Sequence, residues 1–282
     1  MSPQPVVARP QLALSDLSVT EFLTLSRMGF LPHGLVVGSA VFDAGWTNLS
    51  GRTQEVRSLS QAMRAARTAA VLRMRQQAAK LNAEGVVGVR LQVEHHRWRG
   101  GHQVAKIIAL GTAIAYDTEH APHDMKGAPT LHLADGRPFT SALSGQDFVT
   151  LLRAGYRPIS LAVGCCVYEL NGYGVYPYAQ AGRNDEIAEY TQALFDARES
   201  AMERMTQDLF AEFGLAGAHA AAGHPDAPVG VVGMSVSEAA HAGMRNVIEY
   251  TAVGTAVAHV RDGDPRRAAS PPAPAIVVPL DR

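Results

Sequence analysis

An internal repeat constrains this chain more than any other feature of its sequence. Residues 17–42 align without a gap on residues 143–168. A repeat of this kind indicates one structural unit that occurs twice and that must be read as such before anything else. The matched pairs are Phe22/Phe148, Leu25/Leu151, Arg27/Arg153, Gly29/Gly155, Pro32/Pro158, Leu35/Leu161, Val37/Val163, Gly38/Gly164 and Val41/Val167.

The correspondence continues after a short insertion in the second copy. A length of 282 residues also accommodates two domains, each large enough for its own core. We therefore expect domains at 17–117 and 143–261, a linker at 118–142, and disorder at 1–16 and 262–282. The later matched pairs are Gly51/Gly182, Arg52/Arg183, Glu55/Glu186, Ala66/Ala197, Arg67/Arg198, Met74/Met205, Gly88/Gly233, Gly111/Gly254 and Thr112/Thr255.

Each copy carries the same series of secondary-structure signals. Ser18 and Glu21 have the spacing of a capping box, which begins a short helix that Gly29 ends. A β-branched run at 35–42 predicts a buried strand. Apolar and small residues then recur every three or four positions between 63 and 81, which predicts a long helix, and two strand-like runs follow. The expected fold class is α+β, with an antiparallel sheet covered by one long helix in each copy.

Composition excludes several classes of protein. The formal net charge is −1, which does not suggest binding to nucleic acid, and no run of about 20 apolar residues could cross a membrane. The N-terminus lacks a signal-peptide pattern, so we expect a cytoplasmic protein. Only Cys165 and Cys166 are present, and neighbours on a strand point to opposite faces, so no disulfide framework is expected.

Two groups of residues are candidates for holding a divalent transition metal. Imidazole and thiolate ligands suit zinc, copper or nickel. Adjacent histidines on a strand face opposite ways, which favours exposed hairpin residues, and Ser39 and Ala40 align with the cysteines, which favours buried core positions. The candidates are His95, His96 and His102, and Cys165 and Cys166.

Residues shared by both copies are candidates for ligand or interface contacts. The matched glycines suit a close approach to a ligand, but a bulge or tight packing explains them better. The matched charges could hold an anion at a helix N-terminus, although an ion pair between subunits is preferred because no phosphate-binding loop accompanies them. These residues are Gly88, Gly111, Thr112, Gly233, Gly254 and Thr255, and Arg52, Glu55, Arg183 and Glu186.

Together these motifs resemble the YbjQ-like family, which is described as "putative heavy-metal-binding". The resemblance is carried by an Ala-Arg opening of an Ala-rich helix, by 82–89 (Asn-Ala-Glu-Gly-Val-Val-Gly-Val) and by Gly111-Thr112-Ala113, and it covers residues 17–117 and 143–260. It implies small β-α-β-β domains, similar to dodecin subunits, that form homo-oligomeric rings, commonly pentamers. Binding of heavy-metal ions is likewise an implication of the resemblance.

No catalytic motif is found, so we expect a non-enzymatic, ring-forming protein that binds heavy-metal ions. One alternative is a scaffold for partner proteins, reached through the C-terminal tail, without metal. Another is a dodecin-like binder of small molecules at subunit interfaces. The stacking surfaces of that binder would be Trp46, Trp98, Tyr173, Tyr176 and Tyr178.

Overall fold

A computed structural model shows a mixed α+β chain with two four-stranded sheets and four α-helices among its described residues. It describes residues 13–45, 49–97, 103–119, 121–170, 186, 188–215, 217, 223–240 and 246–266. The expected α+β class is therefore confirmed.

The first sheet has the order β1-β4-β3-β5. Its three long strands pair antiparallel, and short β5 adds to β3 in parallel. The long helix α2 packs on β1 and β4. The elements of this half are α1 (Val19–Ser26), β1 (Phe30–Gly45), β2 (Gln54–Glu55), α2 (Arg57–Lys80), β3 (Gly85–Arg97), β4 (Gln103–Tyr116) and the 3₁₀ turn η1 (His123–Met125).

The second sheet has the order β2-β6-β8-β7, and all its pairings are antiparallel. The long helix α4 packs on β6 and β8. Each sheet therefore exchanges one short strand with the other half of the chain, because β2 precedes α2 and β5 precedes α3. The elements are β5 (Phe139–Thr140), α3 (Gly145–Arg153), β6 (Tyr156–Glu169), α4 (Ala188–Glu212), β7 (Gly230–Ala240) and β8 (Val247–His259).

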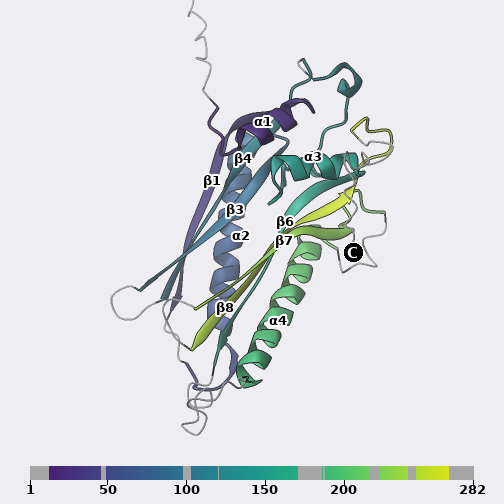
Figure 1. The fold of residues 1–282 in the computed structure, drawn as a ribbon. Coiled ribbons are helices and arrows are strands. Elements are labelled where there is room, and N and C mark those ends of the chain that lie inside the picture. The colour runs from purple at the N-terminus through teal and green to yellow at the C-terminus, as the bar shows by residue number, and fades with distance from the viewer. Residues whose placement is uncertain are drawn as a thin grey trace, which may run out of the picture.

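The layers alternate between sheet and helix (Figure 1). Helix α2 lies between the two sheets, since its apolar side chains share one core with the first sheet and with β6. Helix α4 covers the opposite face of the second sheet and forms a second core with it. Helices α1 and α3 pack against one end of the first sheet, and no other described element forms a further layer over its outer face or over the outer side of α4.

The helix signals in the sequence correspond to real caps. Ser18 accepts a hydrogen bond from the Glu21 amide while Glu21 binds the Ser18 amide, and Ser144 accepts one from the Asp147 amide. Strand β1 begins at Phe30, earlier than the expected start at residue 35. Pro32 is tolerated there because β1 is an edge strand and its register shifts between Pro32 and Gly34.

The segment expected to be a linker is partly built into the structure. Leu131 and Leu133 are buried, and Thr140 and Ser141 lie between the two sheets. Residues 262–266, expected to be disordered, are also described, and the buried Arg266 side chain binds Asp264 and lies over the ring of Phe30.

Candidate assembly interface

The contact between α2 and the second sheet is one of the internal interfaces between the two halves. Side chains at alternate positions of β6 point toward α2, and Leu161, Cys165 and Val167 are buried in the core that α2 shares with the first sheet. The intervening position Gly164 faces the other way. A Cβ there would lie 2.0 Å from the Ala201 carbonyl oxygen of α4. Strand β6 is thus covered by a helix on both faces.

A buried ion pair fixes α2 against the middle of this sheet. Arg67 Nη2 lies 3.2 Å from Glu249 Oε1 and donates to Thr251 Oγ1 at 2.8 Å. Only 5% of the Arg67 side chain and 6% of the Glu249 side chain is exposed. A buried charge is costly unless it is paired, so this pair holds the two elements in one register.

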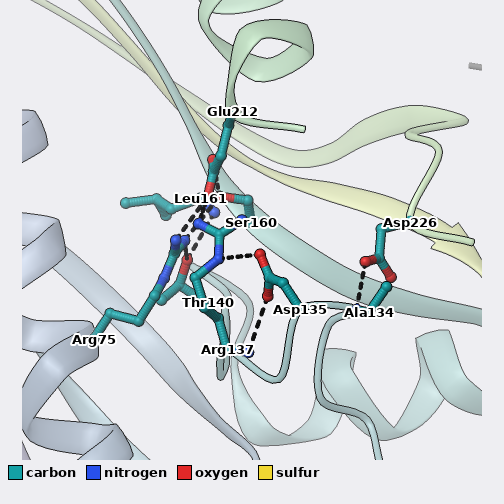
Figure 2. Close-up of polar contacts among 9 residues, drawn as sticks. All are labelled: Arg75, Ala134, Asp135, Arg137, Thr140, Ser160, Leu161, Glu212 and Asp226. Atoms are coloured by element: carbon teal, nitrogen blue, oxygen red, sulfur yellow. Dashed lines mark hydrogen bonds and ion pairs between the residues drawn. The ribbon is translucent and has the colours of Figure 1, made fainter. Parts of the chain in front are cut away.

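A polar network closes one end of the same interface (Figure 2). Arg75 of α2 pairs with Glu212 of α4 at 2.7 Å and donates to Thr140 and Ser160. Ser160 donates to Glu212 at 2.6 Å, so helix, strand and linker meet at one carboxylate. Arg137 also contacts Glu212, at 3.4 Å, and pairs with Asp135.

The segment before α3 adds to the edge of β3. Phe139 and Thr140 pair with Gly85 and Val86, and the amides of Gly88 and Val89 then donate to the carbonyls of Leu143 and Ser141 at 2.9 Å each. Edge strands expose unpaired backbone groups, and this segment satisfies those of β3.

The segments before α1 and α3 make matching hydrogen bonds to aligned threonines. Thr112 interacts with the Ser15 hydroxyl and the Asp16 amide, at 3.4 and 3.3 Å. At the aligned Thr255, the Ser141 hydroxyl lies at 3.3 Å and the Ala142 amide at 2.9 Å. Thr112 and Thr255, candidates for ligand contacts, therefore hold the chain segment that enters each short helix.

Aligned positions differ sharply in exposure. In the first half, Phe22 and Val41 are 40% and 54% exposed, whereas their aligned residues Phe148 and Val167 are 0% exposed. In the second half the difference is reversed, because Val232 of β7 is 36% exposed and its counterpart Val87 is 0% exposed. Side chains that one half buries against the other are exposed in the half that lacks this neighbour.

These exposed apolar side chains fall into two groups, one on and before α1 and on β1, and one on α4 and on and beside β7. Most of the exposed large apolar residues of the described chain belong to one or the other. The first surface, which we call the head, comprises Leu14, Val19, Phe22, Leu23, Leu35, Val37 and Val41. The second, the tail surface, comprises Phe195 and Met202 of α4 and Val229, Val232, Met234 and Val236 on and beside β7.

The matched glycines serve packing and strand shape. Gly88 and Gly233 have φ values of +64° and +60° at register shifts in β3 and β7, as a β-bulge requires. A Cβ on Gly111 or Gly254 would lie within 2.7 Å of a valine side chain on the adjacent strand.

The matched charges are not brought together. Glu55 pairs with Arg204 of α4 at 2.6 Å, so it links the two halves, while Arg52 and Glu186 are exposed. Arg183 lies outside the described residues.

The two cysteines do not form a joint metal site. Cys165 lies in the core around α2 and Cys166 in the core around α4, on opposite faces of β6. Burial raises the pKa of both thiols, that of Cys166 to about 11, which disfavours the thiolate that binds metals. Within the described part of the chain, no three His, Cys, Asp or Glu side chains are grouped to hold a metal ion.

The histidine candidates lie at a hairpin that is only partly described. The backbones of His95 and His96 pair with Ala105 and Val104 at the end of β3, and His102 lies outside the described residues. The proposed stacking residues Trp46, Trp98, Tyr173, Tyr176 and Tyr178 also lie outside them.

Sequence reasoning missed the residues that join the two halves most firmly. Arg67 is matched by Arg198 in the repeat, but the partner Glu249 aligns with Lys106, so the repeat alignment gives no sign that Arg67 and Glu249 pair.

Among the described residues, none of the helices combines the length and the hydropathy that a membrane span requires.

Comparison with known proteins gives two matches. A family model described as "Putative heavy-metal-binding" (YbjQ_1) matches residues 33–117. Over 270 residues the chain is 35% identical to the "Encapsulin nanocompartment protein Rv1762c" of Mycobacterium tuberculosis (strain ATCC 25618 / H37Rv). That alignment covers 95% of this chain and 91% of the relative.

Proposed function

Because the chain belongs to the YbjQ-like family and shares its family with the M. tuberculosis encapsulin nanocompartment protein, we propose that it is a non-enzymatic, self-assembling component of a protein nanocompartment. The observation that carries the self-assembly is the pair of complementary apolar surfaces, the head and the tail. The nanocompartment role is drawn from the relative.

The proposal treats residues 17–117 and 143–261 as two tandem units, each of the β-α-β-β kind found in dodecin subunits. Three observations support this: both sheets share the antiparallel core orders β1-β4-β3 and β6-β8-β7, both carry one long helix, and Thr112 and Thr255 make matching hydrogen bonds. The contact between the first and second unit then serves as a template for the contact between chains.

In this assembly α4 of one chain takes the place that α2 has inside the chain. Helix α2 covers Leu161, Val163 and Val167 of the second sheet, and the aligned Leu35, Val37 and Val41 on the first sheet are open. The outer side of α4 presents Phe195 and Met202 where α2 has Arg64 and Val71. Apolar side chains on both partners favour their burial against each other.

The same placement of one chain against the next also brings a second pair of segments together. Residues 139–143 pair with β3 inside the chain, and residues 13–17 occupy the aligned positions of the first unit. Residues 13–17 of one chain would therefore add to the open edge of β7 in the next. A single arrangement of two chains would thus cover the exposed apolar side of α4 and also pair the open edge of β7. Strand addition of this kind is a common mode of recognition.

Contacts between two different surfaces propagate until they close into a ring or continue as a filament. We expect closure, and five chains, which would bring ten units into the assembly, is the number that we propose. Native mass spectrometry at micromolar protein concentration reads the number of chains directly. A chain that remains monomeric under these conditions contradicts the proposal.

Point substitutions test the two surfaces separately. Val41→Asp places a charge in the head and Phe195→Asp places one in the tail, so each should reduce the assembly to monomers because an unpaired charge would be buried. The matched control is Leu72→Glu. Leu72 is 49% exposed on α2 but belongs to neither surface, and the aligned residue of α4 is already Glu203. This control should assemble like the unmodified chain.

Mixing the two monomeric variants tests the head-to-tail order. The Val41→Asp chain keeps its tail and the Phe195→Asp chain keeps its head, so an equimolar mixture should form a one-to-one dimer and stop there. Each variant alone should stay monomeric. Failure of the mixture to form the dimer would rule out a contact between different surfaces and favour a symmetric one.

Association with a nanocompartment needs a separate test, because it is drawn from the relative rather than from the two surfaces. The C-terminal segment from residue 267 onward contains Pro271-Pro272-Ala273-Pro274 and is our candidate for reaching partner proteins. Truncation should start after Arg266, which is buried, so that the fold is kept. If the truncated chain no longer co-purifies with a compartment protein, the C-terminal segment is supported as the link. If the compartment protein is retained, that role is contradicted.

Metal binding remains a separate proposal that depends on the hairpin histidines. The two cysteines do not fit a joint site, so His95, His96 and His102 are the remaining candidates. Elemental analysis of untagged protein should find metal that is lost when the three histidines are changed to Ala. Absence of metal, together with no thermal shift on adding zinc, copper or nickel, removes this proposal and leaves the assembly unaffected.

A further inference from the structure

The outer edge of β6 is open over the middle of its length. Strand β6 pairs with β8 along one edge, and short β2 pairs with only the last two residues of the other. Above this, the Leu161 amide donates to the Thr140 hydroxyl at 3.0 Å (Figure 2), and the Arg204 guanidinium donates to the Cys165 carbonyl at 3.2 Å. Backbone groups face the same edge at every second residue. The Leu161 carbonyl, both backbone groups of Val163 and the Cys165 amide therefore face this edge, and none has a hydrogen-bond partner among the described residues.

The first unit closes the same edge with a glutamine. The Val37 amide, which aligns with that of Val163, donates to Gln77 Oε1 of α2 at 2.9 Å. The residue of α4 that aligns with Gln77 is Asp208, whose carboxylate pairs with Arg64 instead. The Val163 amide thus lacks the side-chain acceptor that its counterpart has.

A cavity of about 380 Å³ lies against the open edge, between α2 and α4. Its volume falls within the range of ligand sites, which is roughly 300–1,000 Å³. The charges of the arginines that line it are paired with carboxylates, so what the cavity offers is aliphatic surface and free backbone groups. An extended aliphatic peptide matches both. The aliphatic side chains of the wall include Val71, Leu161, Val163, Met205 and Leu209.

The sequence near the C-terminus contains a segment of this kind. Ile276, Val277 and Val278 are three consecutive β-branched residues, which favour strands. No charged residue occurs from 275 to 280. The segment is therefore aliphatic and suited to an extended conformation.

This segment is tethered within reach of the cavity. Arg266 is buried and binds the Pro129 carbonyl. Four residues further along, the Leu133 amide donates to the carbonyl of Arg137, which lines the cavity, so Pro129 and Leu133 are at most about 14 Å apart. The ten residues from Arg266 to Ile276 extend to about 33 Å, which spans this distance.

We propose that residues 276–278 dock in this cavity of their own chain as a short strand on the open edge of β6. The segment enters from the Arg137 end and runs parallel to β6. Ile276 then bonds the Leu161 carbonyl and the Val163 amide. Val278 bonds the Val163 carbonyl and the Cys165 amide, so all four open groups are satisfied.

This register also accommodates the proline that follows the segment. In a strand whose residues 276 and 278 face β6, the nitrogen of Pro279 faces away from β6, so the amide hydrogen that proline lacks is not needed. Docking keeps the segment from other proteins, and so it regulates access to the C-terminus. It depends neither on assembly nor on a nanocompartment role.

A labelled peptide of residues 272–282 tests the docking by fluorescence anisotropy. The full chain with Ile276→Ser, Val277→Ser and Val278→Ser, which we call the triple-serine chain, should bind one peptide saturably because its own segment no longer fills the cavity. The chain with the natural segment should bind the peptide at least tenfold more weakly, since a tethered segment competes at an effective concentration on the order of millimolar. A peptide with the same three serines is the control and should not bind.

Two results would overturn the proposal: absence of saturable binding to the triple-serine chain, and equal binding to both chains, which would mean that the cavity is open when the natural segment is present. Both chains carry Phe195→Asp, so the measurement does not depend on the head-to-tail contact. Docking on a second copy would instead produce dimers of the chain with the natural segment that the three serines abolish. That result would overturn docking within one chain.

Substitutions in α4 place the peptide on the β6 edge. Asp208→Gln introduces the residue that accepts from the Val37 amide in the first unit, so it should occupy the Val163 amide and weaken peptide binding to the triple-serine chain at least tenfold. The matched control is Glu203→Gln, the same change at an exposed position of α4 outside the cavity, and it should leave the affinity within about twofold. Equal affinities of the two variants would contradict pairing with β6.

A second pair of variants tests the cavity without altering a polar group. Val71→Phe fills part of the cavity and should weaken peptide binding at least tenfold. Met202→Phe changes the aligned position of α4, which does not line the cavity, and should leave the affinity within about twofold. Unchanged affinity in Val71→Phe would show that the peptide binds elsewhere, and the proposal would fall.

Discussion

Arg67 and Arg198 occupy aligned positions on the two long helices, yet only Arg67 is buried. The second sheet covers Arg67 and supplies Glu249 and Thr251, while no described element covers Arg198. The environment of a residue in this chain is therefore set by which unit lies beside it as much as by its place in the repeat.

Arg67→Met should lower the free energy of unfolding by about 3–5 kcal/mol, because Glu249 would stay buried after losing the Arg67 guanidinium. Chemical denaturation of the monomeric Phe195→Asp chain measures this without a contribution from assembly. The control Arg198→Met should change stability by less than about 0.5 kcal/mol. The double variant Arg67→Met/Glu249→Met should recover most of the loss, and a loss that persists in full would show that the pair itself is not the cause.

Glu84 gives the chain a stability that depends on pH. Burial raises the pKa of its carboxyl above the ordinary value, although the Leu131 amide and Arg266 oppose this shift. The folded state therefore holds this proton more tightly than the unfolded state, so the contribution of Glu84 to stability falls as pH rises from 4 to 7. Glu84→Gln should match the unmodified chain near pH 4 and be more stable at pH 7. Denaturation curves at the two pH values check this, and a variant less stable at pH 7 would contradict it.

At the scale of elements, each long helix lies unusually close to the strand beneath it. A Cβ on Gly38 would lie 2.0 Å from the Ala70 carbonyl oxygen, and a Cβ on Gly164 equally close to that of Ala201. Glycine at these positions allows the backbone of α2 to approach β1 and that of α4 to approach β6, and the alanine-rich helix faces complete the close contact.

Gly38→Ala and Gly164→Ala should each destabilise the chain by about 1–3 kcal/mol, because the helix must move away from its sheet. Thermal and chemical denaturation measure the effect. Ser39→Ala is the control, since Ser39 is exposed on the opposite face of β1 and its replacement should be nearly neutral. If Gly38→Ala or Gly164→Ala left the stability unchanged, the helices would not be held at this distance from the strands.

Much of this element structure could be predicted from the sequence. The capping residues Ser18 and Ser144, the β-branched apolar run at 35–42 and the small-residue helix stripe are local signals, and they lead to the observed elements. The strand at 35–42 was expected to be buried, and this is wrong for Leu35, Val37 and Val41, which are exposed. The sandwiching of α2 between two sheets could not be predicted, because it depends on contacts such as Arg67 with Glu249 across 182 residues. Residue type alone makes Cys165 and Cys166 candidate metal ligands, and their side chains lie on opposite faces of β6.

At the scale of the whole molecule, the two halves are joined by burial and pairing as well as by the chain itself. Helix α2, strand β5 and the polar network around Arg75 all cross the boundary. The connecting turn at Gly127 is exposed, and a Cβ added there would meet no described atom within 4 Å.

A protease site inserted at Gly127 should therefore be cut without separating the halves. After cleavage the two fragments should elute together in size-exclusion chromatography, because residues 139–143 still pair with β3 and the second sheet still covers α2. The same insertion combined with Arg67→Met weakens that contact and should release some of the fragments. Separation of the fragments after cleavage alone would show that the covalent link holds the halves together.

The fused order of the two units also limits the symmetry of any ring. Each chain that joins adds two positions at once, so a ring closed by head-to-tail contacts contains an even number of units. A ring of five single units, which the family resemblance makes the common case, is thus inaccessible to this chain. Neighbouring units differ chemically, since Phe195 of the second unit aligns with Arg64 of the first, and Glu249 of the second aligns with Lys106 of the first. Any such ring would therefore have a rotational symmetry of half its number of units, and its surface would alternate between two kinds of site.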